Sequence, residues 1–218
     1  MRLPLAITLA LLATQAQATG LEDAMNRYPP LIIGANTDPV AGPVAPRACP
    51  PAGSVVEQKG APAFEYLGAS SKNPNLCHLR LGPDTVDAWY GIWLTSWPGA
   101  DQAYPALTRA MQRGTGAIEA FDTVMSPGYA YHDVIRNEGV ETINLLGAKY
   151  QALKISHYRE GFEGNTYRSV STIWKDIPSG LLIYGTYQHI SGTPELDDPL
   201  IPTRIAPQLT NQPAPSAR

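Results

Sequence analysis

Alternating apolar and polar positions between Tyr129 and Ser191 predict a continuous antiparallel β-sheet. Four strand-like segments follow one another here, and only tight turn signals separate them. The sharpest element is the hairpin STIWKDIPSGLLIY, from Ser171 to Tyr184, in which two β-rich runs flank an Asp-x-Pro-x-Gly turn. Short turns can join only antiparallel neighbours, so we expect a meander of adjacent strands.

Both faces of this sheet are expected to carry apolar side chains. Leu153, Ile155 and His157 fall on one face of a strand, and Tyr150 and Tyr158 fall on the other. A sheet that is apolar on both sides needs cover on both sides. We therefore expect a curved sheet with an apolar concave side, covered by the remainder of the chain.

A smaller β unit precedes this sheet. Its expected strands are separated by Gly60, by Asn73-Pro74-Asn75 and by Gly82-Pro83-Asp84. They are Ser54–Glu57, Ala63–Leu67, Cys77–Leu81 and Thr85–Leu94.

One short helix is predicted between the two β units. Asp101 is a suitable N-cap, Pro105 is tolerable in a first turn, and Gly114 is a stop signal. The helix and the first β unit are the available covers for the two faces of the larger sheet. The fold class is therefore mainly β: a curved antiparallel meander sheet, a smaller disulfide-tied β unit and one short connecting helix.

The predicted organisation has six segments. They are a signal peptide (1–18), a Pro-rich arm (19–53), the first β unit (54–98), the connecting helix (99–115), the antiparallel sheet (116–193) and a Pro-rich tail (194–218), which we expect to be disordered beyond about Ile205.

The N-terminus predicts export. Arg2 precedes an apolar run from Leu5 to Ala13, and Ala16-Gln17-Ala18 is an A-x-A cleavage site, so we expect cleavage after Ala18. The apolar run is too short to cross a bilayer, and no other window is long enough. We expect a periplasmic or secreted protein that does not span the membrane.

The cysteine content and the net charge further restrict the compartment and the partners that we expect for this protein. Cys49 and Cys77 are the two cysteines of the chain, and an oxidising compartment favours a disulfide between them; the alternative is a redox or metal-binding thiol pair. The net charge of −3 and the absence of clustered Lys and Arg argue against a nucleic-acid partner.

The segment from Gly139 to Ile155 (GVETINLLGAKYQALKI), followed by the Trp174-Lys175-Asp176 hairpin and Gly180-Leu-Leu-Ile-Tyr184, resembles uncharacterised bacterial exported proteins with a curved antiparallel sheet. These are loosely similar to periplasmic lipoprotein-carrier half-barrels. The resemblance implies the fold, and it implies no functional residue. The first β unit with its cysteine pair departs from a plain carrier half-barrel.

Aromatic residues are the candidate ligand-binding residues. Trp89, Trp93 and Trp97 have even spacing, which on one strand places them on one face, where they form either part of the core or a platform for sugar rings. Trp174 and Tyr184, in the hairpin of the larger sheet, complete the set.

Catalytic chemistry has weaker support in the sequence. His132, His157 and His189 on neighbouring strands could in principle hold zinc, but their spacing matches no metal motif. The adjacent His132 and Asp133 point to opposite faces of a strand, which disfavours a His–Asp pair between them. Glu160 and Glu163 lie in an expected loop, and no serine-hydrolase motif is present. We therefore expect no catalytic residues, no metal and no cofactor.

Three hypotheses remain open. The first is a non-enzymatic cell-envelope protein whose curved sheet binds an apolar ligand, such as a lipidic molecule or another envelope component, or a partner segment. The second is a carbohydrate-binding or protein-interaction module that uses the Trp-rich strand. The third is a hydrolase.

Overall fold

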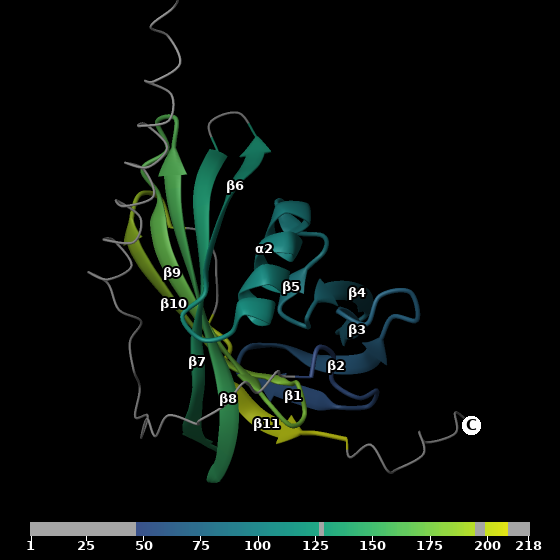
Figure 1. The fold of residues 1–218 in the computed structure, drawn as a ribbon. Coiled ribbons are helices and arrows are strands. Elements are labelled where there is room, and N and C mark those ends of the chain that lie inside the picture. Colours follow the sequence, from purple (N-terminus) through teal and green to yellow (C-terminus); the bar gives the residue numbers. More distant parts are fainter. Residues whose placement is uncertain (1–46, 127–128, 195–198, 209–218) are drawn as a thin grey trace, which may run out of the picture. The chain divides into compact units, whose positions relative to one another are not determined.

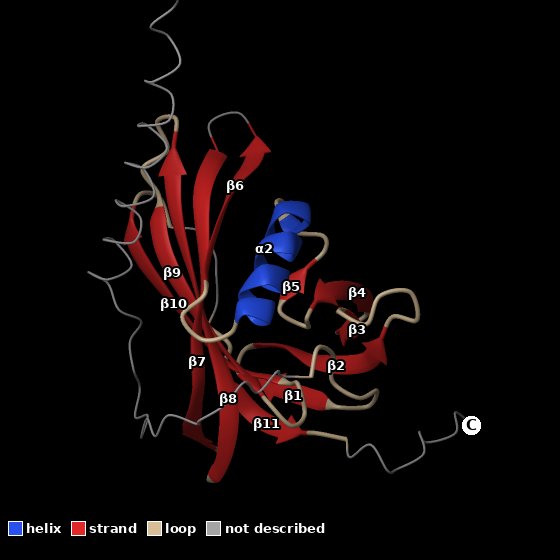
Figure 2. Ribbon diagram, in the orientation of Figure 1, coloured by secondary structure: helices blue, strands red, loops and turns tan. Residues whose placement is uncertain are grey.

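Two antiparallel sheets and one helix make up the described part of this chain. The structure is a computed structural model that describes residues 47–126, 129–194 and 199–208, all within the unit Ile32–Arg218. The expected signal peptide and most of the Pro-rich arm lie outside the described residues. The fold is mainly β, as predicted (Figures 1 and 2).

The larger sheet contains five strands in the order β10-β9-β8-β7-β6, each antiparallel to its neighbour. They are β6 (Ile118–Ser126), β7 (Tyr129–Leu145), β8 (Ala148–Phe162), β9 (Arg168–Asp176) and β10 (Leu182–Ser191). The meander predicted between Tyr129 and Ser191 is therefore confirmed. Its longest pairing joins β7 and β8 through the positive-φ turn residues Leu146 and Gly147.

The predicted Asp-x-Pro-x-Gly hairpin joins β9 to β10. The Asp176 carboxylate accepts hydrogen bonds from the backbone N–H of Ser179 at 3.0 Å and from its hydroxyl at 2.5 Å. Gly180, with a φ of 72°, then donates its N–H to the Asp176 carbonyl at 2.8 Å. The side chain of Asp176 thus completes the turn that the sequence pattern indicates.

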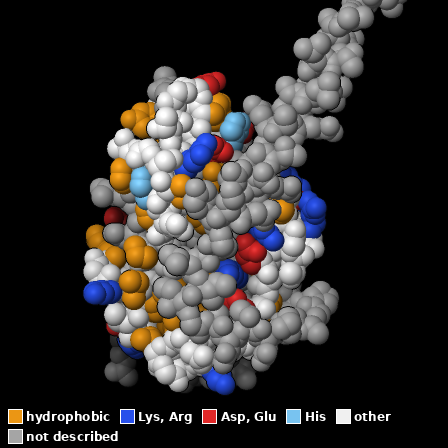
Figure 3. Space-filling view, turned by 90° about the vertical axis from the view of Figure 1, so that its left-hand side faces the viewer, with side chains coloured by type: hydrophobic (Ala, Val, Ile, Leu, Met, Phe, Trp, Pro, Cys, Tyr) orange, Lys and Arg blue, Asp and Glu red, His pale blue; other side chains and the backbone are white. Residues whose placement is uncertain are grey.

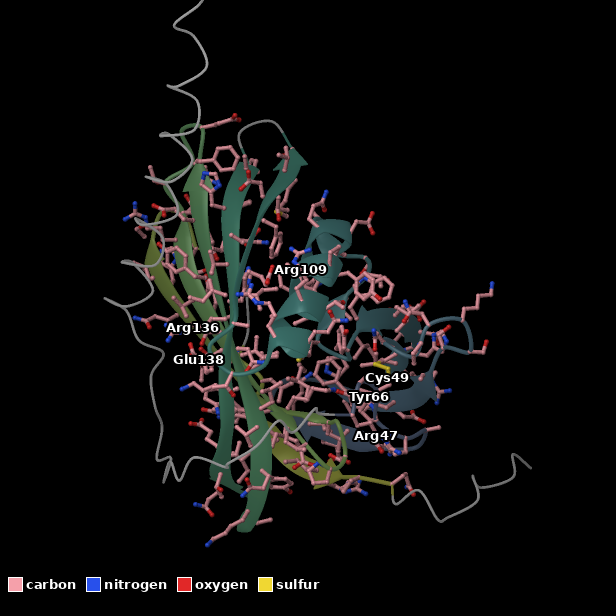
Figure 4. All side chains as sticks on the ribbon, viewed as in Figure 1. Arg47, Cys49, Tyr66, Arg109, Arg136 and Glu138 are labelled. Carbon is pink, nitrogen blue, oxygen red and sulfur yellow. A yellow bond between two sulfur atoms is a disulfide. The ribbon has the colours of Figure 1, made fainter. Side chains whose placement is uncertain are left out.

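A β-bulge in β7 bends this sheet next to the helix. Asn137 pairs with Ile155 and Gly139 pairs with Lys154, so Glu138 is the extra residue. The Asn137 amide holds the bulge because it accepts from Gly139 N at 3.0 Å and donates to a helix carbonyl. Gly139 has a φ of 96°, and a Cβ there would lie 2.7 Å from a side-chain carbon of the helix–β6 connection. Glu138 itself pairs with Arg136 at 3.2 Å (Figure 4).

The smaller sheet contains six strands in the order β11-β1-β2-β3-β4-β5. They are β1 (Val55–Gln58), β2 (Ala61–Ala69), β3 (Leu76–Leu81), β4 (Asp84–Trp89), β5 (Trp93–Leu94) and β11 (Pro202–Ala206). Cys49 is bonded to Cys77 of β3, so the predicted disulfide ties the arm to the third strand (Figure 4).

Strand β11 was not expected, because its sequence lies in the segment interpreted as a Pro-rich tail. It pairs with β1 in antiparallel register, with Val56 opposite Ile205 and Val55 opposite Ala206. The first β unit is therefore completed by a strand far away in the sequence. Pro202 is compatible with this position because β11 is an edge strand.

The expected strand from Thr85 to Leu94 is wrong in one respect: the chain reverses within it. Tyr90 has a φ of 55° and Gly91 a φ of 65°, and this turn separates β4 from β5. Trp89 and Trp93 are therefore cross-strand partners, not neighbours on one face of a single strand.

The helix α2 (Ala100–Arg113) ends at Gly114, as predicted. Its N-cap is Gly99, so the prediction that Asp101 caps it is wrong, and Asp101 lies in the first turn instead. Pro105 lies inside the helix, beyond the first turn in which we expected it. Arg109 ties the helix to β6 through a 2.6 Å contact with Glu119 (Figure 4).

The helix and the smaller sheet both pack on the same face of the larger sheet, and not one on each face as expected (Figure 1). Leu107 of α2 packs with Leu153 and Ile155. The side chains of Tyr158 and Val170, elsewhere in the larger sheet, are also buried.

No helix among the described residues is long and apolar enough to cross a membrane.

Lys175 of β9 joins the two sheets. Its buried ammonium donates to the carbonyls of Tyr90 at 2.8 Å, Ala48 at 3.1 Å and Gly180. Burial lowers its pKa to about 7, against the opposing effect of the Asp176 carboxylate. One side chain thus connects the arm, the β4–β5 turn and the β9–β10 turn.

Candidate functional site

A cavity of about 320 Å³ lies between the two sheets and the helix. The larger sheet contributes Ile135, Ile155 and Ile173 to its lining, and the smaller sheet contributes Phe64 and Leu79. These side chains come from strands that are distant in sequence, so the cavity exists only when both sheets are packed together. The apolar concave side expected for the curved sheet is present, and it lines this cavity.

The β4–β5 turn and the start of the helix connection complete the wall. Trp93 and Trp97 line the cavity together, with their ring centroids 6.3 Å apart in an edge-on arrangement. Trp93 is 6% exposed and Trp97 is 49% exposed, so one indole is enclosed and the other reaches solvent. Trp97 therefore marks the part of the wall nearest to solvent.

The lining also contains polar and charged side chains. His157 and Arg159 of β8 both line the cavity, and both contact the buried carboxylate of Asp133 on β7. Asp133 accepts hydrogen bonds from His157 Nε2 at 2.7 Å, Arg159 Nε at 2.8 Å and the hydroxyl of Thr123 at 2.6 Å. We call Asp133, His157 and Arg159 the polar cluster.

The charge of Asp133 is stabilised by its partners. Burial alone raises the pKa of this carboxyl group, because its side chain is fully shielded from water. The hydrogen bonds and positive charges of His157 and Arg159 outweigh that effect and lower the pKa to about 2. Asp133 is therefore an anion at neutral pH and can only accept hydrogen bonds.

This carboxylate also determines which ring nitrogen of His157 donates to it. Because Asp133 carries no proton, His157 Nε2 must carry the hydrogen that joins them. The imidazole also contacts the indole of Trp93, with ring centroids 4.8 Å apart.

The three tryptophans of the expected platform have different surroundings. Trp89 is stacked against Tyr104 of α2 with ring centroids 3.9 Å apart, and Trp93 is buried. Trp97 alone of the three is substantially exposed. The structure brings Trp93 and Trp97 together at the cavity, and it places Trp89 outside the lining.

Trp174 and Tyr184 lie in the core and do not line the cavity. Their rings are 5.1 Å apart, and the Trp174 indole N–H donates to the carboxylate of Glu141 at 2.5 Å. Lys154 lies 5.7 Å from the same indole ring. This group joins β7, β8, β9 and β10.

The histidines proposed as a zinc site are not assembled into one. His132 contacts Asp122 at 2.5 Å, and His189 contacts the carbonyl of Gly192 at 3.0 Å, whereas His157 belongs to the polar cluster. Within residues 47–126, 129–194 and 199–208, no three His, Cys, Asp or Glu side chains are placed to hold a metal ion.

The polar cluster was not predicted, although the sequence contains a signal for two of its three residues. Alternation along β8 places His157 and Arg159 on one face with Ile155, and this was the available signal. From the sequence, Asp133 was a candidate partner only for His132, its neighbour in the chain. Its actual partners lie on the adjacent strand.

Charged side chains elsewhere on the surface do not form a patch of one sign on the face shown in Figure 3, where basic and acidic groups are interspersed among the described residues. The expectation that the chain does not bind nucleic acid stays a prediction.

No protein-family model matches this chain, and comparisons with curated proteins and with solved structures also find no match. The function must therefore be argued from the cavity and its lining.

Proposed function

We propose that this chain is an exported, non-enzymatic protein of the cell envelope that binds a small apolar molecule in the cavity between its two sheets. The observation that carries the proposal is a cavity of about 320 Å³ that is lined by side chains of both sheets and of α2 and is partly open to solvent. Ligand sites in proteins begin at about 300 Å³ and are mostly apolar with a few convergent polar groups.

The size of the cavity indicates the size of its occupant. One water molecule takes up about 30 Å³ in the liquid, so the space corresponds to a molecule of roughly ten non-hydrogen atoms. This is a small ligand, not a segment of another protein. An eight-carbon chain with one polar end has the appropriate size.

Export supports the same proposal independently. The N-terminal pattern predicts cleavage after Ala18, and the disulfide between Cys49 and Cys77 is compatible with an oxidising compartment. N-terminal sequencing of the protein recovered from the periplasm or medium would test this part. A mature protein that begins with the original Met1 would contradict it.

Binding can be tested with octanol, a neutral probe of the appropriate length, by calorimetric titration of the folded, delipidated chain. We expect saturable one-to-one binding. The variant Ile173→Trp places a large ring at the cavity wall and should abolish binding. Val124→Trp adds the same ring at a position that is 70% exposed on β6, and it should leave binding unchanged.

The outcome that would contradict the proposal is equally specific. If octanol does not bind, or if it binds Ile173→Trp as well as the wild type while both variants remain folded by circular dichroism, the cavity is not a ligand site. The carbohydrate hypothesis would then rest on Trp97, the exposed member of the three indoles.

A further inference from the structure

The larger sheet has an outer face that points away from the cavity. Tyr158 of β8 lies on this face, because it alternates with His157 and Arg159, which line the cavity. Val134 of β7 and Val170 of β9 are directly opposite Tyr158 in the antiparallel register, so the three side chains form one row on the outer face. The helix and the smaller sheet pack on the other face (Figure 1).

This row is nevertheless buried. Val134 is 3% exposed, Tyr158 is 0% exposed and Val170 is 4% exposed. The ring of Tyr158 extends further from the sheet than the valine on either side, so the valines cannot shield its outer edge. Arg136, in the next row, is paired with Glu138 at 3.2 Å, and its Nε is buried as well. Burial of this extent requires a further layer over the outer face.

Two stretches of chain beside the described residues lead to the cavity side. Residues 195–198 precede Leu200, which lines the cavity. Residues 209–218 follow Gln208, whose backbone N–H donates to the hydroxyl of Ser54, next to β1 of the smaller sheet, at 3.0 Å. Neither stretch starts beside the outer face.

Residues 32–46, which we call the arm segment, lead instead to the end of β9. They are followed by Arg47, whose carbonyl oxygen would lie 2.7 Å from a Cβ at Gly180 in the β9–β10 turn. The next carbonyl along the arm accepts a hydrogen bond from Lys175 of β9 at 3.1 Å. The arm segment therefore starts at one end of a strand that contributes to the buried row.

The arm segment is long enough to reach this row. Val170 precedes Asp176, the last residue of β9, by six residues, or about 20 Å at about 3.3 Å per residue. Val40 precedes Arg47 by seven residues, so an extended chain of about 23 Å brings it level with Val170.

The composition of the arm segment also suits a cover for an apolar row. Asp38 is its one charged residue, so burial of the segment removes little charge from water. Its prolines restrict the unfolded chain and so reduce the entropy that is lost when the segment is ordered. The prolines are Pro39, Pro43 and Pro46, and the large aliphatic residues are Ile32, Ile33, Val40 and Val44.

We propose that the arm segment runs along the outer face of the larger sheet and covers Tyr158 and Val170, with Val40 level with this row. The occupant of the outer face is then the chain itself. The larger sheet is covered on both faces, as a sheet with apolar residues on both faces requires. The inference does not depend on the proposed ligand, because the cavity lies on the opposite side of the sheet.

The test places the photoreactive residue benzoylphenylalanine at Val40 of the exported chain. After irradiation, digestion with trypsin and mass spectrometry, peptide 28–47 should be joined to peptide 155–159 or to peptide 169–175. Fragmentation should locate the bond at an outer-face residue such as Tyr158 or Val170. The cross-linked protein should have the mass of one chain. The same residue at Ala214, in the tail, is the matched control and should give neither product.

A second measurement uses the natural side chains. In the wild type, hydroxyl radicals should modify Tyr158 more slowly than Tyr129, which is 59% exposed. Val40→Asp introduces a charge where the arm segment is covered, so it should increase the modification of Tyr158, whereas Ala214→Asp should not.

The opposite results would overturn the proposal. A cross-linked product with the mass of two chains would assign the outer face to a second copy. A bond from position 214 to peptide 155–159 or 169–175 would assign it to the tail. Absence of any bond from position 40 to the larger sheet, or equal modification of Tyr158 and Tyr129 in the wild type, would show that the arm segment does not cover this face.

Discussion

The buried carboxylate of Asp133 should contribute strongly to stability, and Asp133→Asn tests this. Lowering the pKa of Asp133 from 3.8 to about 2 corresponds to about 2.5 kcal/mol, at about 1.4 kcal/mol per pKa unit. Because the pKa is lowered in the folded state, this stability is complete above pH 4 and is lost as the pH falls toward 2. At pH 7, replacement also leaves the partly buried Arg159 without its anion, so we expect a total loss of about 3 kcal/mol.

The measurement is urea unfolding followed by far-ultraviolet circular dichroism at pH 7 and at pH 3. The difference in unfolding free energy between wild type and Asp133→Asn should shrink at the lower pH, because at pH 3 the carboxyl group of the unfolded wild-type chain has taken up its proton while that of the folded chain is still mostly ionised. Asp122→Asn is the matched control, since Asp122 pairs with His132 at 2.5 Å but is 63% exposed, and such surface pairs contribute below about 1 kcal/mol. Equal effects of the two substitutions at pH 7, or a difference independent of pH, would refute the reasoning.

Three further predictions concern the connections that hold the cavity walls together. The unfolding free energy should rise by about 1.4 kcal/mol per pH unit between pH 7 and 10 because the pKa of Lys175 is lowered in the folded state, and Lys175→Met should lack this slope in urea titrations. Replacing Cys49 and Cys77 by serine should cost about 3 to 4 kcal/mol in the same assay, given their separation of 28 residues; an unchanged unfolding midpoint would contradict this. Gly99→Ala should destabilise more than Gly60→Ala: both positions have positive φ, but only the new Cβ at Gly99 would lie 2.3 Å from a β6 side chain. Equal losses of thermal stability would show that the clash is relieved.

The larger sheet could be predicted because its strands and turns are determined by residues that are close together in the sequence. Each strand has its own alternation, and the turn between β9 and β10 is built by Asp176, Ser179 and Gly180 within the turn sequence itself. The disulfide was predictable for a similar reason, since the chain contains only two cysteines.

The strand β11 and the cavity depend on long-range pairing, and no local pattern reports it. By its sequence alone, Pro202–Ala206 is predicted to be part of a polar tail. It forms a strand because it pairs with β1, where Val56 is one of its partners, and Leu200 is buried only in the assembled fold. The β4–β5 turn was not predicted for another reason. β-forming residues flank Gly91, and Lys175, from the other sheet, binds the Tyr90 carbonyl. Local propensity was overridden there by tertiary contacts.

The polar cluster shows how much one inserted residue can change a site. From the turn at Leu146 and Gly147, the regular pairing of β7 with β8 would place Asp133 opposite Glu160, and two like charges directly opposite are unfavourable. Glu138 shifts the register by one residue, so that Asp133 pairs with Arg159 and turns toward the face that carries His157. Alternation within β7 or within β8 cannot reveal this shift, because each strand is regular on either side of the bulge. The information lies in Asn137 and Gly139, whose amide and positive φ fix the bulge against the helix and thereby decide which carboxylate lies beside His157 and Arg159.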